Sequence, residues 1–185
     1  MNVINTKLKG VVIIEPDVFG DHRGFFLESY NQQKYQEIGI KKPFVQDNHS
    51  RSGKGVLRGL HFQKTKPQGK LVRVSAGEVF DVAVDVNPHS ETFAQWVGVI
   101  LSSENHKQFY VPPGYAHGFV VLSETADFQY KCTNFYDPAD EGGIVWNDEQ
   151  LAIDCPISSP SLSDKDVKLP TLKNAHADLL LLNEK

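Results

Sequence analysis

Apolar and polar residues alternate along much of this chain with a period of two. Between residues 79 and 86 every even-numbered position carries a large apolar side chain, whereas Asp81 and Asp85 stand at odd-numbered positions. Successive side chains of a β-strand point to opposite faces, so this segment is predicted to be a strand with one apolar face. The sequence Asn87-Pro88-His89-Ser90 then ends the pattern, as a turn does.

Short segments of the same kind recur between glycines and prolines, and they predict a mainly β chain. Further strands are expected at residues 11–15, 24–29, 43–50, 56–63, 68–74, 96–101, 108–111, 117–122 and 127–135. Many short strands at close spacing are typical of an antiparallel sandwich or barrel.

Helical signals are few in this sequence. Asn31 is placed to cap a short helix that runs to Ile38 and ends at Gly39, and a second short helix is expected from Leu172 onwards. A chain of 185 residues is long enough for one substantial core. We therefore expect a single domain over residues 1–185, in which the residues from about 171 form a peripheral tail.

Some predicted strand faces are polar where a plain core would be apolar. Gln46, Asn48 and Ser50 share one strand face, and Tyr130 shares a face with Phe128 on another strand. Buried polar groups need hydrogen-bond partners. One explanation is that the mouth of the barrel holds a polar ligand.

Composition limits the kinds of binding partner and the cellular compartment that we expect for this protein. The net charge of −4 argues against nucleic-acid binding, which usually needs an excess of Lys and Arg on one face. Apolar runs are too short to span a bilayer, and the first residues do not resemble a secretory signal, so we expect a cytoplasmic protein without a membrane partner. The two cysteines, Cys132 and Cys155, are expected to be free thiols.

The strongest chemical signal is the pair His61 and Lys70, which flank the polar turn at residues 64–69 in an expected hairpin. A neutral imidazole can accept a carbon-bound proton near neutral pH, and a nearby ammonium group can stabilise negative charge on oxygen. Each residue alone is more often structural or solvated. Arg58 shares a face with His61 only if the strand is bulged, which Gly59 could permit.

A second histidine, His117, follows the turn Pro112-Pro113-Gly114 in a Pro-x-Gly-x-x-His pattern. This pattern resembles the second motif of the cupin superfamily, whose metal-binding members carry His-x-His in the first motif. Here the first motif reads His61-Phe62-Gln63, which leaves one histidine where a protein metal site needs three or four ligands. We therefore expect a cupin-like barrel without a metal.

Two arginines and one tyrosine complete the candidate chemistry. A planar guanidinium suits phosphate oxygens, so Arg23 and Arg58 together would suit a diphosphate, although Arg23 could equally belong to an ordinary surface hairpin. Tyr130 is by composition more often structural. If Tyr130 faces His61 across a pocket, its hydroxyl could return a proton to the opposite side of a planar intermediate.

Several motifs taken together resemble one family in order along nearly the whole chain, from about residue 10 to about residue 170. They are Asp21–Phe26, Gln46–Asn48, Leu57–Gln63, Gln68–Val74, Pro113–Phe119, Gly142–Asp148 and Leu162–Asp166. This combination resembles the dTDP-4-dehydrorhamnose 3,5-epimerase family of the cupin superfamily, which implies a jelly-roll fold with a few short peripheral helices.

The resemblance also implies roles for individual residues. It makes His61 the general base, Asp166 the carboxylate that orients it, Lys70 the group that stabilises the enolate oxygen, Tyr130 the proton donor, and Tyr136 the ring that stacks on thymine. The positions that it implies for substrate binding are Arg23, Glu28, Gln46, Asn48, Arg58, Lys70, His117, Glu141 and Lys165. A homodimer without any cofactor is implied as well.

The activity implied is epimerisation of dTDP-4-dehydro-6-deoxy-D-glucose at C3 and C5, which yields dTDP-4-dehydro-L-rhamnose for dTDP-rhamnose biosynthesis. Four alternatives stay open: a 3-epimerase that acts on one carbon, a ketoisomerase of another deoxysugar pathway, a metal-dependent cupin dioxygenase and a sugar-binding cupin module. The ketoisomerase would be expected to show paired histidines, and the dioxygenase a His-x-His motif. The binding module gives no reason for His61, Lys70, Tyr130 and Asp166 to occur together.

Overall fold

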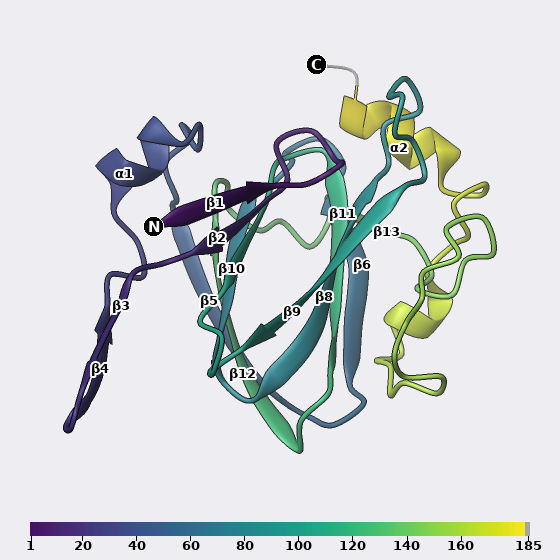
Figure 1. Ribbon diagram of the computed structural model, residues 1–185. Coiled ribbons are helices and arrows are strands. Elements are labelled where there is room, and N and C mark those ends of the chain that lie inside the picture. The colour runs from purple at the N-terminus through teal and green to yellow at the C-terminus, as the bar shows by residue number, and fades with distance from the viewer. Residues whose placement is uncertain (184–185) are drawn as a thin grey trace.

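The computed structural model describes residues 1–183, which form two antiparallel sheets packed face to face (Figure 1). One sheet has six strands in the spatial order β1 (Asn2–Asn5), β2 (Val12–Glu15), β10 (Gln108–Val111), β7 (Lys70–Ala76), β12 (Thr125–Cys132) and β5 (Gln46–Gly53). The other has five strands in the order β13 (Glu141–Gly143), β6 (Leu57–Gln63), β11 (Tyr115–Val121), β8 (Glu78–Asp85) and β9 (Trp96–Ser102). The predicted mainly β sandwich is confirmed.

The helices are short and lie outside the two sheets. They are α1 (Gln32–Glu37), a 3₁₀ turn η1 (Asp166–Lys168) and α2 (His176–Asn183). The cap predicted for the first helix is confirmed, because the Asn31 side chain accepts hydrogen bonds from the backbone N–H groups of Gln33 and Lys34. Gly39 follows with a φ of +97°, the left-handed conformation that commonly ends a helix. Within residues 1–183 no helix has the length and apolar character needed to cross a membrane.

The core between the sheets is apolar at one end only. There Val72 and Phe128 of the six-stranded sheet pack against Val79, Ala83 and Phe119 of the five-stranded sheet, all buried. The Phe119 and Phe128 rings stack with their centroids 3.9 Å apart. Toward the other end the inward positions of the same strands become polar, so the sandwich is closed at one end and can hold a ligand at the other.

Strand β8 differs from the prediction of one apolar and one polar face. The face with Val82 and Val84 lies on the outside of its sheet, and the face with Asp81 points into the sandwich, where that carboxylate is 0% exposed. Both faces of the strand are therefore buried. The cause lies in the C-terminal part of the chain, which covers the outside of the five-stranded sheet (Figure 1).

The C-terminal segment packs more closely than a peripheral tail implies. Leu172, Ala175 and Leu179 are buried in one cluster with Leu60 of β6 and Val84 of β8. Burial of one leucine side chain contributes about 2 kcal/mol to stability. This segment therefore belongs to the fold, and its first buried residue is Leu172.

The hairpin expected between residues 56–63 and 68–74 is wrong. Strand β6 belongs to the five-stranded sheet and β7 to the six-stranded sheet. Residues 64–69 therefore form a crossover loop from one sheet to the other. The sequence pattern of strand, turn and strand is the same for a hairpin and for such a crossover, so only the tertiary pairing distinguishes them.

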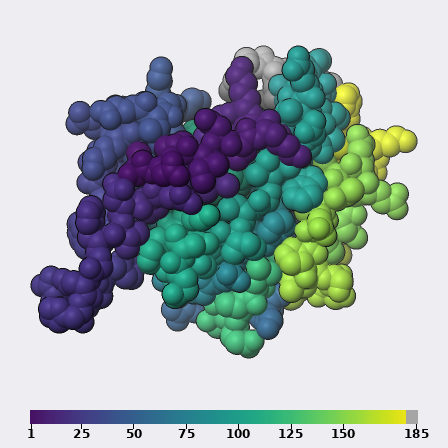
Figure 2. Space-filling model, in the orientation of Figure 1, coloured from purple at the N-terminus to yellow at the C-terminus, as the bar shows by residue number. Residues whose placement is uncertain are grey.

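A two-stranded hairpin, β3 (Val18–Asp21) and β4 (Gly24–Leu27), extends from the body of the molecule (Figures 1 and 2). Its aromatic side chains are largely exposed: Phe19 by 66%, Phe25 by 61% and Phe26 by 69%. Three exposed aromatic rings on one projecting element are characteristic of an interaction surface.

Candidate active site

A cavity of about 370 Å³ opens between the sheets at the polar end of the sandwich. His61 and Arg58 reach it from β6 of one sheet, and Lys70 and Tyr130 reach it from β7 and β12 of the other. The crossover loop, residues 64–69, joins the strands that carry His61 and Lys70. His61 and Tyr130 thus lie on facing walls of the cavity. The sequence alone could not say whether these two residues face each other.

His61 is held by Asp166, which lies 105 residues further along the chain. Its Nε2 atom is 2.6 Å from Asp166 Oδ1, and both side chains are mostly buried. The backbone N–H of Asp166 donates to Ser163 Oγ at 3.1 Å, which fixes the start of η1. We assign the Nε2 proton to the bond with the carboxylate, which leaves the lone pair on Nδ1 free to accept a proton.

The other nitrogen of His61 faces a second carboxylate. His61 Nδ1 is 3.8 Å from Glu141 Oε1, while Glu141 Oε2 accepts hydrogen bonds from Lys165 Nζ at 2.7 Å and from the Tyr136 hydroxyl at 3.0 Å. Burial alone would raise the pKa values of Glu141 and Asp166, but hydrogen bonds and the neighbouring positive charges outweigh it and lower both. Both carboxylates are therefore ionised beside the imidazole at neutral pH.

Lys70 points into the same cavity from the first position of β7. Its pKa is lowered, chiefly because burial disfavours the charged ammonium group, and the nearby charges of Asp81 and Glu141 act in the opposite direction. Across residues 1–183 no carboxylate lies within ion-pair distance of its Nζ atom. The ammonium group is thus available to a ligand rather than committed to a salt bridge.

A bulge in β6 brings Arg58 and His61 to the same face, as Gly59 was expected to permit. The pairing with β11 skips a position, since His61 opposes His117 but Arg58 opposes Phe119. Gly59 has a φ of +126°, and a Cβ atom there would lie 2.6 Å from the Cα atom of Gly118. The expectation of a bulge at Gly59 is therefore confirmed.

Tyr130 lies where the apolar core gives way to the cavity, next to Phe128 on β12. Its pKa is raised chiefly by burial, so the hydroxyl remains protonated near neutral pH. Arg58 contributes a guanidinium group to the same cavity, where two of its nitrogens donate to Ser52 Oγ at 3.1 and 3.2 Å.

His117 forms a second, fully buried histidine–carboxylate pair. Its Nε2 atom is 2.9 Å from Asp81 Oδ1, and the other carboxylate oxygen of Asp81 has no hydrogen-bond partner among the described residues. His117 does not line the main cavity. It borders a small adjoining pocket together with His61 and Lys70, so it lies beneath the reacting residues.

The structure brings most predicted site residues to one cavity. These are Gln46, Asn48, Arg58, His61, Lys70, Tyr130, Tyr136, Glu141, Lys165 and Asp166. Arg23 and Glu28 are not among its lining residues. Arg23 lies in the β3–β4 hairpin, where it pairs with Asp21, and Glu28 pairs with Lys34 of α1.

Four further residues line the cavity without having been predicted: Phe62, Gln63, Gln68 and Ser163. Gln63 has the same strand parity as His61, so the period of two already placed it inward. Gln68 and Ser163 lie in loops, for which parity gives no signal. In the described part of the chain, no three His, Cys, Asp or Glu side chains are grouped as a metal ion requires.

Comparison with known proteins identifies the family that the sequence motifs resemble. A family model described as dTDP-4-dehydrorhamnose 3,5-epimerase matches residues 5–174. The proteins named dTDP-4-dehydrorhamnose 3,5-epimerase from Salmonella typhimurium and Escherichia coli are 60% and 58% identical to the chain. These alignments cover 95% and 93% of the chain and 97% and 95% of the relatives.

Solved structures are similar as well. The dTDP-6-deoxy-D-glucose-3,5-epimerase of Legionella pneumophila, in complex with dTDP-4-keto-L-rhamnose, has a TM-score of 0.94 and 57% identity, with 96% of each chain covered. A 3′-monoepimerase from Streptomyces bikiniensis, in complex with dTDP-quinovose, has a TM-score of 0.87 and 33% identity, with 93% of this chain and 88% of that chain covered.

Proposed function

This chain belongs to the dTDP-4-dehydrorhamnose 3,5-epimerase family, and from that premise we propose how its cavity transfers protons at two carbons of one sugar. The enzyme is an isomerase of dTDP-rhamnose biosynthesis. It converts dTDP-4-dehydro-6-deoxy-D-glucose to dTDP-4-dehydro-L-rhamnose by inverting C3 and C5. Both carbons are adjacent to the C4 ketone, which makes their protons removable.

His61 is the proposed general base at both carbons. Its Nδ1 atom takes the proton, while the 2.6 Å contact between Nε2 and Asp166 holds the ring and favours the tautomer with a free Nδ1. The imidazolium that forms lies between the carboxylates of Asp166 and Glu141, which stabilise its charge. Asp166 acts through His61 and is a positioning residue.

Removal of the proton leaves an enolate, whose oxygen needs a positive partner. Lys70 is the proposed partner, because its ammonium group faces the cavity without a carboxylate in ion-pair distance among the described residues. Tyr130 is the proposed acid that returns a proton from the opposite sheet. Its raised pKa keeps it protonated until that step. The facing positions of His61 and Tyr130 are the observation that carries this mechanism.

The remaining cavity residues are assigned to binding the nucleotide and the sugar. Arg58 is proposed to bind the diphosphate, and Tyr136, which is 46% exposed at the rim, to stack on the thymine ring. Gln46, Asn48, Glu141 and Lys165 are proposed as further polar contacts of the substrate, and His117, which borders the small adjoining pocket, is proposed to support His61 and Lys70 from beneath. The Legionella relative with dTDP-4-keto-L-rhamnose bound supports a dTDP-linked ketosugar as the ligand.

We test the assignment by incubating the enzyme with dTDP-4-dehydro-6-deoxy-D-glucose in deuterated water and reading the product by NMR. Deuterium at both C3 and C5 is the expected result. Deuterium at C3 alone would identify a 3-epimerase. The similarity to the Streptomyces 3′-monoepimerase is the reason to distinguish this outcome from exchange at both carbons. Deuterium at neither carbon would refute the mechanism.

The matched variant is His61→Ala, which is expected to lose exchange at both carbons while it still binds dTDP. Normal exchange in His61→Ala would show that another group is the base. Unchanged dTDP binding with no exchange in the wild-type protein would instead favour the sugar-binding module.

We further propose a homodimer in which the β3–β4 hairpin of one subunit reaches the cavity of the other. Arg23 lies in this hairpin and Glu28 directly follows it, away from the cavity of their own subunit. The exposed rings of Phe19, Phe25 and Phe26 supply the apolar contact that such an interface needs. Contact with the partner's cavity reconciles the substrate-binding role of Arg23 and Glu28 with their positions here.

The cytoplasm is the proposed compartment. Both cysteines are free thiols, with Cys132 buried in the sandwich and Cys155 partly exposed. Thiols of this kind are usual where the cellular environment is reducing.

A further inference from the structure

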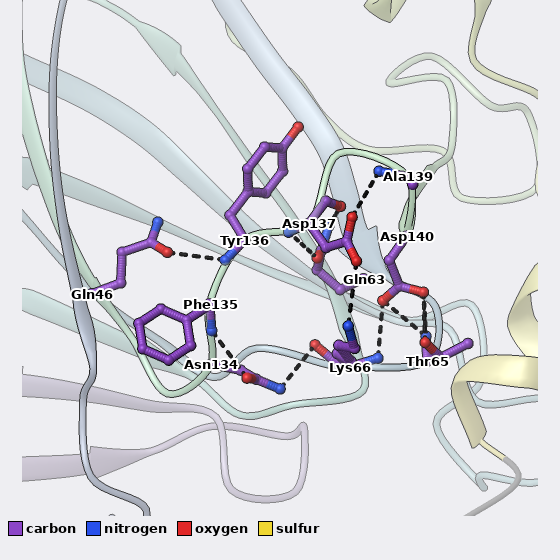
Figure 3. A network of polar contacts seen from close by, with 10 residues as sticks. All are labelled: Gln46, Gln63, Thr65, Lys66, Asn134, Phe135, Tyr136, Asp137, Ala139 and Asp140. Carbon is purple, nitrogen blue, oxygen red and sulfur yellow. Dashed lines mark hydrogen bonds and ion pairs between the residues drawn. The ribbon is translucent and has the colours of Figure 1, made fainter.

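Two buried polar side chains beside the cavity direct their hydrogen bonds to loops rather than into the cavity. Gln63 is 3% exposed and Asp140 is 7% exposed. Burial of such groups costs free energy unless they are well paired, so their partners show what they hold in place. Both residues hold residues 133–140, which we call the Tyr136 loop: Gln63 bonds this loop to the end of β6, and Asp140 bonds it to the crossover loop, residues 64–69 (Figure 3).

Gln63 holds the centre of the Tyr136 loop. Its Nε2 donates to the carbonyl of Asp137 at 3.0 Å, and its Oε1 accepts from the backbone N–H of Asp137 at 2.9 Å. One carboxamide thus satisfies both backbone groups of one residue, as a neighbouring strand would. Gln63 also lies two positions from His61 on β6, so the strand that carries the base fixes this loop.

Asp140 holds the far end of the same loop to the crossover loop. Its carboxylate accepts from the Thr65 hydroxyl at 2.7 Å and from the backbone N–H groups of Thr65 and Lys66 at 2.9 to 3.1 Å. Burial alone would raise the pKa of Asp140, but these hydrogen bonds lower it, so the carboxylate stays ionised. The backbone N–H of Lys64 adds a bond to the Asp140 carbonyl at 2.9 Å.

Tyr136 is fixed on both sides by these contacts. Its own backbone N–H donates to Gln46 Oε1 at 2.9 Å, and the backbone of the next residue, Asp137, is paired with the Gln63 side chain. The ring itself is half exposed, and in Figure 3 it points away from the Gln63 and Asp140 side chains. The network therefore defines the backbone of Tyr136, while the ring, whose hydroxyl donates to Glu141 Oε2 at 3.0 Å, keeps exposed surface that a ligand can meet.

We infer that Gln63 and Asp140 are positioning residues for nucleobase recognition, because they hold the Tyr136 loop where the Tyr136 ring can stack on thymine. This inference rests on the proposed role of Tyr136. It assigns a function to Gln63, which stands where a His-x-His motif would have its second histidine. The base His61 and the nucleobase contact are thereby placed relative to each other through one strand.

The test compares variants by calorimetric titration with dTDP and by steady-state kinetics. Gln63→Met keeps the length of the side chain and removes both bonds to Asp137. It is expected to weaken dTDP binding and raise KM about tenfold, with kcat changed less than about threefold, because the reacting groups stay in place. Lys66→Ala is the matched control, since it removes only the exposed ion pair to Asp137 across the same two loops, and it should change dTDP binding less than about twofold.

A double variant separates positioning from general stabilisation. If Gln63 acts through Tyr136, then Gln63→Met/Tyr136→Ala binds dTDP as weakly as Tyr136→Ala alone. Independent, multiplying losses would overturn the inference, as would a Gln63→Met protein that binds like wild type while Tyr136→Ala binds weakly. Unchanged binding in Tyr136→Ala would instead overturn the proposed nucleobase role, and the inference with it. Asp140→Asn, of equal size, provides the same comparison if Gln63→Met does not fold.

Discussion

At the scale of single residues, the charge of Lys70 depends on its buried surroundings. Burial lowers its pKa, while the carboxylates of Asp81 and Glu141 counteract part of that effect. The ammonium group is useful to the enolate only while it is protonated. The cavity therefore gives Lys70 both its catalytic value and its sensitivity to pH.

The pH dependence of the reaction follows from this. Because the pKa of Lys70 is lowered, kcat is expected to fall as pH rises through a value below the roughly 10.4 of an ordinary lysine. Lys70→Met should reduce kcat by about 10²- to 10³-fold and abolish that alkaline limb. The measurement is kcat between pH 6 and the alkaline limit of stability, with the exposed Lys168→Met as the control. An unchanged alkaline limb in Lys70→Met would assign it to another group.

The two histidine–carboxylate pairs have different environments although they lie on neighbouring strands. His61 faces the cavity with one nitrogen free, whereas His117 is buried and Asp81 beneath it is fully enclosed. Only the first pair can exchange a proton with a ligand in the main cavity. This difference in access supports His61 rather than His117 as the base.

At the scale of elements, the bulge in β6 decides which side chains meet. Without it Arg58 would point to the outside of the sheet, because its parity is opposite to that of His61. The bulge depends on Gly59, whose φ and close approach to Gly118 leave no room for a side chain. The diphosphate contact and the base are thus aligned by one glycine.

Gly59→Ala is accordingly expected to lower the free energy of unfolding by about 2 to 4 kcal/mol, through strain at positive φ and the clash with β11. Gly55→Ala is a matched control, because Gly55 also has a positive φ of +77° but open space around it. In Gly55→Ala the free energy of unfolding should fall by only about 1 kcal/mol. Urea unfolding measures both, and equal losses would show that the close packing at Gly59 has no added cost.

At the scale of the whole molecule, one chain holds nearly all of the proposed site but not Arg23 and Glu28. The hairpin that carries Arg23 extends from the body with three exposed aromatic rings (Figure 2). A closed two-fold dimer would use this surface twice and place each hairpin at the partner's cavity. The completeness of each active site would then depend on assembly.

Mixed dimers test this directly. Arg23→Ala and His61→Ala homodimers are each expected to be strongly impaired, for different reasons. Random mixing of the two chains should restore about a quarter of the wild-type activity, because half of the dimers have one site with both residues intact. Light scattering must first show a dimer. If mixed dimers recover no activity, Arg23 acts in the active site of its own subunit. A monomer in light scattering would refute the dimer proposal.

The sequence by itself determined the class of fold, the sequence family and most of the residues that line the candidate cavity. Strand parity indicated that Gln46, Asn48 and Tyr130 would point inward, and the motifs around His61 and Lys70 indicated proton transfer. The inward positions are confirmed, because side-chain alternation is a local property that each segment expresses without the rest of the chain. Proton transfer by His61 and Lys70 stays a proposal.

Tertiary structure alone decided how those segments meet. It replaced the expected hairpin by a crossover between sheets and turned Asp81 into the sandwich, since the C-terminal segment covers the opposite, apolar face of β8. It also brought His61 within 2.6 Å of Asp166 across 105 residues, a contact that the family resemblance implied but that no local pattern contains. It also gave Gln63 its partner in Asp137. Pairing between distant segments depends on which faces the whole chain can bury together, and no local pattern contains that information.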